Sequence, residues 1–172
     1  KWAVITGSAC TGKTTMINMF ADRGFSIIPE TARKYIEQEI ARGRDLENII
    51  KNPRTQLEII KMQRCAESGD TVNINDLAFL DRGLPDSLTF FRYNGLDPNS
   101  ILFECFQKRY ALVFILDRLT LQLDGARIPD ESFLNYLDTW LERDYAALGY
   151  QVIRVPVKPP EARLEFILDI LS

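Results

Sequence analysis

Short apolar runs alternate along the chain with longer segments in which apolar residues recur every three or four positions. The apolar runs predict β-strands at Trp2–Thr6, Phe25–Ile28, Leu77–Leu80, Ala111–Leu116 and Gln151–Val155. The intervening segments predict amphipathic helices. Strands that alternate with helices in this way are typical of an α/β fold with a largely parallel sheet.

The helix boundaries follow from capping and breaking residues. We predict helices over Lys13–Asp22, Thr31–Arg42, a segment from near Pro53 to just before Gly69, a segment from Pro129-Asp130 to Leu148, and Pro160–Leu171. Glycines follow the first, second and fourth of these, at positions where helices commonly end: Gly24, Gly43 and Gly149. Thr31 is expected to cap the second helix. In the third helix, Leu57, Ile60 and Cys65 are the expected apolar positions.

The composition fits one globular domain. The chain has 172 residues, 46% of them hydrophobic and 26% charged, and no repeat or long linker divides it, so we expect a single domain over residues 1–172. The net charge is −3, and lysine and arginine are spread along the chain without a basic run. Nucleic-acid binding is therefore not expected.

Cysteine and histidine usage narrows the chemistry further. The three cysteines, Cys10, Cys65 and Cys105, have no metal-ligand spacing, which favours free thiols in a reducing compartment. The chain has no histidine, which excludes histidine acid–base catalysis and most zinc sites. The longest apolar run, Ala111–Leu116, is too short to span a bilayer, and no signal peptide is visible. We expect a cytoplasmic protein with no membrane span.

The segment GSACTGKTT lies between the first predicted strand and the first predicted helix. Gly7 and Gly12-Lys13-Thr14 fit G-x-x-x-x-G-K-[ST], the phosphate-binding P-loop, or Walker A motif. Amides of such a loop and of the helix that follows it can bind phosphates, while Lys13 reaches the β- and γ-phosphates and the Thr14 hydroxyl joins the coordination of Mg²⁺. The residues expected to bind the nucleotide are Gly7, Ser8, Ala9, Cys10, Thr11, Gly12, Lys13, Thr14 and Thr15.

Acids and arginines follow the other predicted strands, at the sheet edge where α/β proteins bind ligands. Asp81 ends an apolar run and has the form of a Walker B acid that holds Mg²⁺. Arg82 either contacts phosphate or substrate, or forms a surface ion pair. Glu30 is either a general base for an acceptor hydroxyl or an acid that stabilises a helix N-terminus. Arg33 is a weaker candidate for supporting the acceptor site.

Three further features leave alternatives open. Arg127 lies in a predicted lid, about residues 117–130, where it either closes over the triphosphate or is simply solvated. Cys10 in the phosphate loop is either a buried, inert thiol or a reactive one. Three aromatic residues are expected in the core rather than around a substrate: Phe90, Phe91 and Tyr93.

Five stretches together carry a family resemblance: GSACTGKTT, IIPETARKYI, FLDRGLPDSLTF, LDGARIPD and YAALGYQVIRVP. From Val4 to about Leu168 the chain resembles the AAA-type P-loop domain family that contains the nicotinamide-riboside kinase domain of NadR. The resemblance implies a three-layer α/β/α P-loop NTPase fold with a five-stranded parallel sheet in the order 2-3-1-4-5. More distantly related deoxynucleoside kinases have an acidic residue after the second strand that acts as the base, an acid–arginine pair after the third strand, and an arginine in the lid. The corresponding residues here are Glu30, Asp81-Arg82 and Arg127.

Two functions are consistent with these residues. The first is a kinase that uses ATP and Mg²⁺ to phosphorylate a nucleoside- or riboside-like hydroxyl, with Lys13, Glu30, Asp81, Arg82 and Arg127 as its catalytic residues. The second is a nucleotide-dependent binding or regulatory ATPase module whose partner is a protein or a lipid. ATP is favoured over GTP because the guanine-reading Asn-Lys-x-Asp motif is absent.

Overall fold

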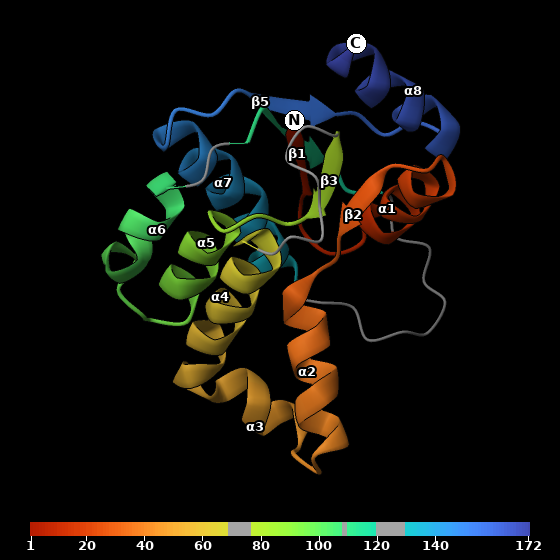
Figure 1. Ribbon diagram of the computed structural model, residues 1–172. Coiled ribbons are helices and arrows are strands. Elements are labelled where there is room, and N and C mark those ends of the chain that lie inside the picture. Colours follow the sequence, from red (N-terminus) through yellow and green to blue (C-terminus); the bar gives the residue numbers. More distant parts are fainter. Residues whose placement is uncertain (69–76, 108–109, 120–129) are drawn as a thin grey trace.

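The computed structural model describes residues 1–68, 77–107, 110–119 and 130–172. In this part of the chain, five parallel strands form one sheet in the order β2-β3-β1-β4-β5, as the sequence predicted. The strands are β1 (Trp2–Thr6), β2 (Ser26–Ile28), β3 (Ala78–Asp81), β4 (Leu112–Leu116) and β5 (Val152–Val155). Figure 1 shows the sheet between two layers of helices. The fold is therefore the three-layer α/β/α arrangement of P-loop proteins.

Alternate residues along each central strand face opposite helix layers. One face of the sheet packs against α1 (Lys13–Asp22) and α8 (Pro160–Leu171) (Figure 1). The core of that layer includes Ala3, Ile5, Phe20, Phe79, Phe114, Leu164 and Ile167. The other face packs under helices that precede and follow β3 and β4, with a core that includes Val4, Leu80, Phe91, Val113, Leu141 and Tyr145. Both faces of the sheet are buried, which explains the continuous apolar runs in its strands.

The helices on the second face are α4 (Pro53–Ser68), α5 (Asp86–Tyr93), a 3₁₀ turn (Pro98–Ile101), α6 (Leu102–Gln107) and α7 (Glu131–Ala147). Helix α2 (Thr31–Ala41) follows β2 and extends beyond the sheet, and α3 (Leu46–Lys51) joins its far end to α4 (Figure 1). Among the described residues, no helix is long and apolar enough to cross a membrane.

Most predicted elements are present with ends shifted by one or two residues, but two local predictions were wrong. Thr31 does not cap α2: Glu30 occupies the N-cap position, without a capping hydrogen bond, and the Thr31 hydroxyl donates to Gln63 Oε1 at 2.6 Å. On α4, Leu57 and Cys65 are exposed, and only Ile60 of the three expected apolar positions is buried. The polar side chain of Gln63 is buried instead, because it has hydrogen-bond partners on three elements.

Candidate functional site

The segment that matches the P-loop motif makes a tight loop between β1 and α1. Gly7 and Gly12 have positive φ angles, and a Cβ at Gly7 would lie 2.9 Å from the Leu116 carbonyl oxygen. Both glycines are therefore required by the backbone. Cys10 also has a positive φ, of 59°, and is exposed. Of the two alternatives for this thiol, the buried one was therefore wrong.

Lys13 points back into this loop. Its ammonium group donates to the carbonyl oxygens of Gly7 at 3.0 Å and Ser8 at 2.6 Å. Burial, together with the positive charge of Arg82, lowers the pKa of Lys13 to about 7, against the opposing effect of Glu30 and two aspartates. Burial makes the charged form of Lys13 costly. An anion bound beside the ammonium group would therefore stabilise that form strongly.

A buried arginine that the sequence analysis missed holds the loop from behind. Arg163, at the start of α8, is 2% exposed. Its guanidinium donates to three backbone carbonyls, those of Thr11 (2.6 Å), Asp117 (2.9 Å) and Pro156 (2.9 Å). It therefore ties the P-loop to the ends of β4 and β5. Nothing in the local sequence distinguishes Arg163 from a surface residue of an amphipathic helix.

Asp81 ends β3 next to the P-loop, as a Walker B acid would. It is 8% exposed, and its Oδ1 is buried without a hydrogen-bond partner among the described residues. Burial, with a further contribution from Glu30, raises the pKa of Asp81 to about 6, against the effect of Arg82 and Lys13. An unpaired carboxylate oxygen fits one ligand of Mg²⁺. Thr14 is exposed on the first turn of α1.

The described residues contain no group of three or more His, Cys, Asp and Glu side chains placed to hold a metal ion. Mg²⁺ commonly binds through one or two carboxylates together with substrate phosphates, rather than in a cage made only of protein. Thr14 and Asp81 are thus a chemically suitable pair only if a polyphosphate supplies further oxygens.

Glu30 and Arg82 form a partly buried ion pair across the ends of β2 and β3. Arg82 Nε donates to Glu30 Oε1 at 2.9 Å, and Arg82 Nη1 donates to Asp86 Oδ1 at 3.1 Å. The Arg82 side chain is 14% exposed, so the expected surface ion pair is in fact a largely buried one. Burial alone would raise the pKa of Glu30, but the charge and hydrogen bond of Arg82, with smaller effects from Lys13 and Arg33, hold it below its ordinary value. Glu30 is therefore ionised at neutral pH.

A cavity of about 370 Å³ opens beside this ion pair. Three of its lining residues, Glu30, Arg82 and Asp86, are joined by hydrogen bonds and form its polar end, and Ala9 of the P-loop also lines it. Its lining further includes seven aliphatic and aromatic side chains: Ile36, Ile50, Ile59, Phe90, Tyr93, Phe133 and Leu137. Of the three aromatics that were expected in the core, only Phe91 is there; Phe90 and Tyr93 line the cavity, and the Tyr93 and Phe133 rings lie 4.5 Å apart between centroids.

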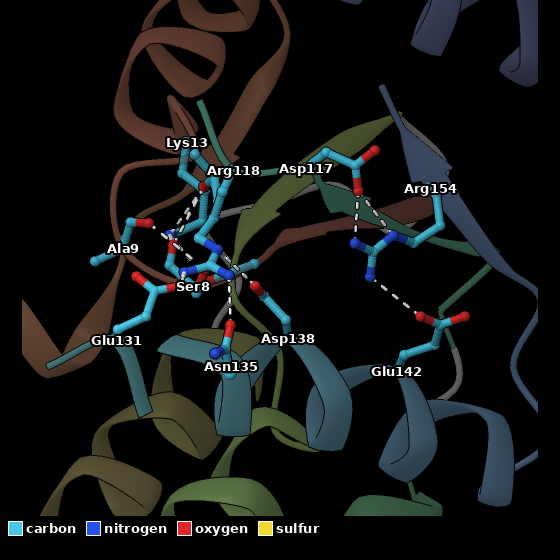
Figure 2. A network of polar contacts seen from close by, with 12 residues as sticks. Ser8, Ala9, Lys13, Asp117, Arg118, Glu131, Asn135, Asp138, Glu142 and Arg154 are labelled. Atoms are coloured by element: carbon cyan, nitrogen blue, oxygen red, sulfur yellow. Dashed lines mark hydrogen bonds and ion pairs between the residues drawn. The ribbon is translucent and has the colours of Figure 1, made fainter. Parts of the chain in front are cut away.

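The acid and arginine that follow β4 have different partners from those after β2 and β3. Asp117 accepts hydrogen bonds from Arg154 of β5, at 2.8 Å from Nε (Figure 2). Arg118 lies near Ser8 and Ala9 in Figure 2, but its guanidinium is held by three side chains of α7: Glu131, Asn135 and Asp138. Arg127 and most of the predicted lid lie outside the described residues.

Comparison with known proteins assigns the chain to a family. A family model described as an AAA domain matches residues 2–163. The chain belongs to this AAA domain family. The comparison with curated proteins gives no match.

Solved structures share the fold of this AAA domain. NadR in complex with NR superposes with a TM-score of 0.77 at 22% identity, over 99% of this chain and 50% of NadR. NadR in complex with NAD and AMP-PNP gives 0.73 at 20% identity, over 98% of this chain and 49% of NadR. Deoxyadenosine kinase from M. mycoides gives 0.63 at 16% identity, over 99% and 98% of the two chains. The chain thus spans about half the length of the NadR structures and has the fold of P-loop kinases.

Proposed function

We propose that this AAA domain is an ATP-dependent kinase that transfers the γ-phosphate of ATP to a hydroxyl of a nucleoside- or riboside-like acceptor. The observation that carries the proposal is the cavity beside the P-loop, in which an ionised carboxylate and an arginine lie at the polar end. A nucleotide-dependent binding module needs the P-loop but has no need for a second pocket that is lined by a carboxylate and an arginine.

The proposed reaction assigns a role to each group. The acceptor oxygen attacks the γ-phosphorus, the bond from that phosphorus to the β–γ bridging oxygen breaks, and ADP leaves. Glu30 takes the proton of the acceptor hydroxyl, and Lys13 and Arg82 stabilise the negative charge of the transferred phosphoryl group. Thr14 and Asp81 would hold Mg²⁺, which neutralises phosphate charge when it is bound. Arg127 is proposed to add a further cation from the lid.

The charges around the cavity favour an acceptor without a phosphate group. Arg82 is the one cationic side chain among the described residues that line the cavity, and it already pairs with both Glu30 and Asp86. A nucleotide acceptor would bring two negative charges to a pocket whose own charge is negative. The aromatic and aliphatic side chains that line the cavity, by contrast, suit a planar base or a similar ring.

A phosphoryl-transfer screen tests the proposal. Nucleosides, other ribosides and the corresponding 5′-monophosphates are incubated with ATP, Mg²⁺ and the protein, and labelled γ-phosphate is followed into product. We expect transfer to at least one unphosphorylated acceptor and none to the monophosphates. ATP binding without transfer to any acceptor would instead support the binding-module function.

A further inference from the structure

Asp86, the first residue of α5, is the most densely bonded carboxylate of the acceptor cavity. It is 3% exposed and accepts hydrogen bonds from four donors on three parts of the chain. Arg82 Nη1 and the Gly83 amide donate at 3.1 and 3.0 Å, and the hydroxyls of Thr6 and Tyr145 also donate to it. Asp86 therefore connects the end of β1, the β3–α5 turn and α7 to one carboxylate.

The backbone at Arg82 needs such support. Its φ is 69°, in the left-handed region that a residue with a Cβ seldom adopts, which costs on the order of 1 kcal/mol or more. The next residue is closely packed, since a Cβ at Gly83 would lie 2.9 Å from Tyr145 Oη. A strained backbone conformation persists only where several surrounding contacts hold it in place. Such residues concentrate at functional sites.

We propose that Asp86 is a positioning residue of the catalytic site, which fixes the Arg82 guanidinium so that it holds Glu30 at the polar end of the cavity. The inference rests on the proposed kinase function. Arg82 uses separate nitrogens for the two carboxylates, Nε for Glu30 and Nη1 for Asp86. Without the Asp86 charge, the hydrogen bond from Arg82 Nε to Glu30 can still form. The guanidinium then lacks the second contact, at Nη1, that fixes its orientation.

A second buried aspartate provides a matched control. Asp144 on α7 is 7% exposed and accepts from Thr89 Oγ1 at 2.7 Å and from Arg92 at 2.9 Å. Like Asp86, it accepts hydrogen bonds from an arginine and a threonine, in this case both on α5, but it does not line the cavity. Asp144→Asn should thus lower the melting temperature as Asp86→Asn does, without changing the catalytic site.

The experiment compares Asp86→Asn and Asp144→Asn with the wild-type protein by two readouts. The first is the ¹⁵N-edited NMR signal of the Arg82 Nε–H group, assigned with Arg82→Lys. We expect Asp86→Asn to shift or broaden this signal and Asp144→Asn to leave it unchanged. The second is steady-state transfer to an acceptor found by the screen. Asp86→Asn should lower kcat by about 100-fold, the loss that a misplacement of about 1 Å can cause, while KM for ATP stays within about twofold.

The two readouts separate the possible failures. An unchanged Arg82 signal in Asp86→Asn overturns the positioning role whatever the activity. A changed signal with wild-type kcat, or a loss of kcat that Asp144→Asn matches, overturns its importance for catalysis. If the wild-type protein transfers phosphate to no acceptor, the proposed function fails, and the NMR comparison still decides whether Asp86 orients Arg82. If neither variant folds, Tyr145→Phe removes one donor to Asp86 and is expected to give a smaller change in both readouts.

Discussion

The two halves of the candidate site are built in different ways. The nucleotide half is one contiguous segment, Gly7–Thr15, whose backbone turns and lysine come from neighbouring residues. The acceptor half is assembled from α2, α3, α4, α5, α7 and the ends of β2 and β3. A short segment can specify a phosphate loop by itself, whereas the acceptor cavity exists only when distant elements pack correctly. The first half should therefore tolerate changes in the second.

The largest effect on ATP binding is expected in the nucleotide half. Lys13→Ala removes the ammonium group that is to bind the β- and γ-phosphates. We expect ATP affinity or turnover to fall by about 10- to 150-fold, since interactions with charged groups are worth about 1.5–3 kcal/mol. Because Lys13 contacts only loop atoms by hydrogen bonds, the fold should survive. Calorimetric titration with ATP and thermal melting measure both. The surface variant Lys61→Ala is the control, and unchanged affinity and turnover in Lys13→Ala would exclude the P-loop assignment.

The next effect concerns Asp81, at the end of β3. Its pKa is about 6 in the folded protein and 3.8 ordinarily, so the folded state binds more protons between these values and stability falls as pH rises through that window. Asp81→Asn has no carboxyl group to ionise in this buried site. Above pH 6 its free energy of unfolding should therefore exceed that of the wild type by about 1–3 kcal/mol, and the difference should vanish near pH 4. Urea unfolding at both pH values measures this. Asp117→Asn, which removes the charge that pairs with Arg154, should show no such gain.

Asp81→Asn has a second consequence if Asp81 also holds Mg²⁺. Stabilisation of the variant by ATP should then lose its dependence on Mg²⁺. A variant that is less stable than the wild type at pH 7.5, or one that keeps the full effect of Mg²⁺, would contradict the role given to this carboxylate.

The nucleotide half could be predicted from the sequence, whereas much of the acceptor half could not. The strand order came from the family resemblance, and the P-loop from spacing alone, because contiguous residues carry it. The Thr31 hydroxyl, Phe90 and Tyr93 were misplaced because their surroundings depend on which helix lies opposite, and α4 turns a face that contains Gln63 inward. Asp86 was not identified, since an aspartate at the start of a helix is common for local reasons.

Proton linkage gives a smaller effect, confined to the nucleotide half. With a pKa of about 7, Lys13 is mostly neutral at pH 8. A triphosphate favours its charged form, so ATP binding at pH 8 should take up roughly 0.5–0.9 proton, and at pH 6 the uptake by Lys13 should be close to zero. Titrations in buffers with different ionisation enthalpies measure this number. Uptake that is the same at both pH values, or absent at pH 8, would show that Lys13 does not titrate in this range.

The smallest expected effect is a change in how readily an alkylating reagent reaches the P-loop. Cys10 is exposed in the P-loop, so alkylation should be slowed by saturating MgATP. The other two cysteines are internal controls: Cys65 is exposed outside the P-loop and should react with or without ATP. Cys105 is buried, and burial raises its thiol pKa to about 12, so it should react slowly in both cases. Mass spectrometry of the peptides gives all three rates, and ATP-independent labelling of Cys10 would place the nucleotide elsewhere.

Glu30→Gln tests the central claim, that the acceptor half performs catalysis. Glutamine keeps an oxygen that can accept from Arg82 Nε but cannot take the acceptor proton. Loss of the buried charge will lower the melting temperature whether or not Glu30 is the base, so the decisive quantity is acceptor-dependent kcat at equal ATP saturation. General-base catalysis typically contributes about 10²–10⁴-fold, and we expect kcat to fall by that factor while ATP affinity stays within about twofold. Full turnover by a folded Glu30→Gln protein would contradict the proposed mechanism.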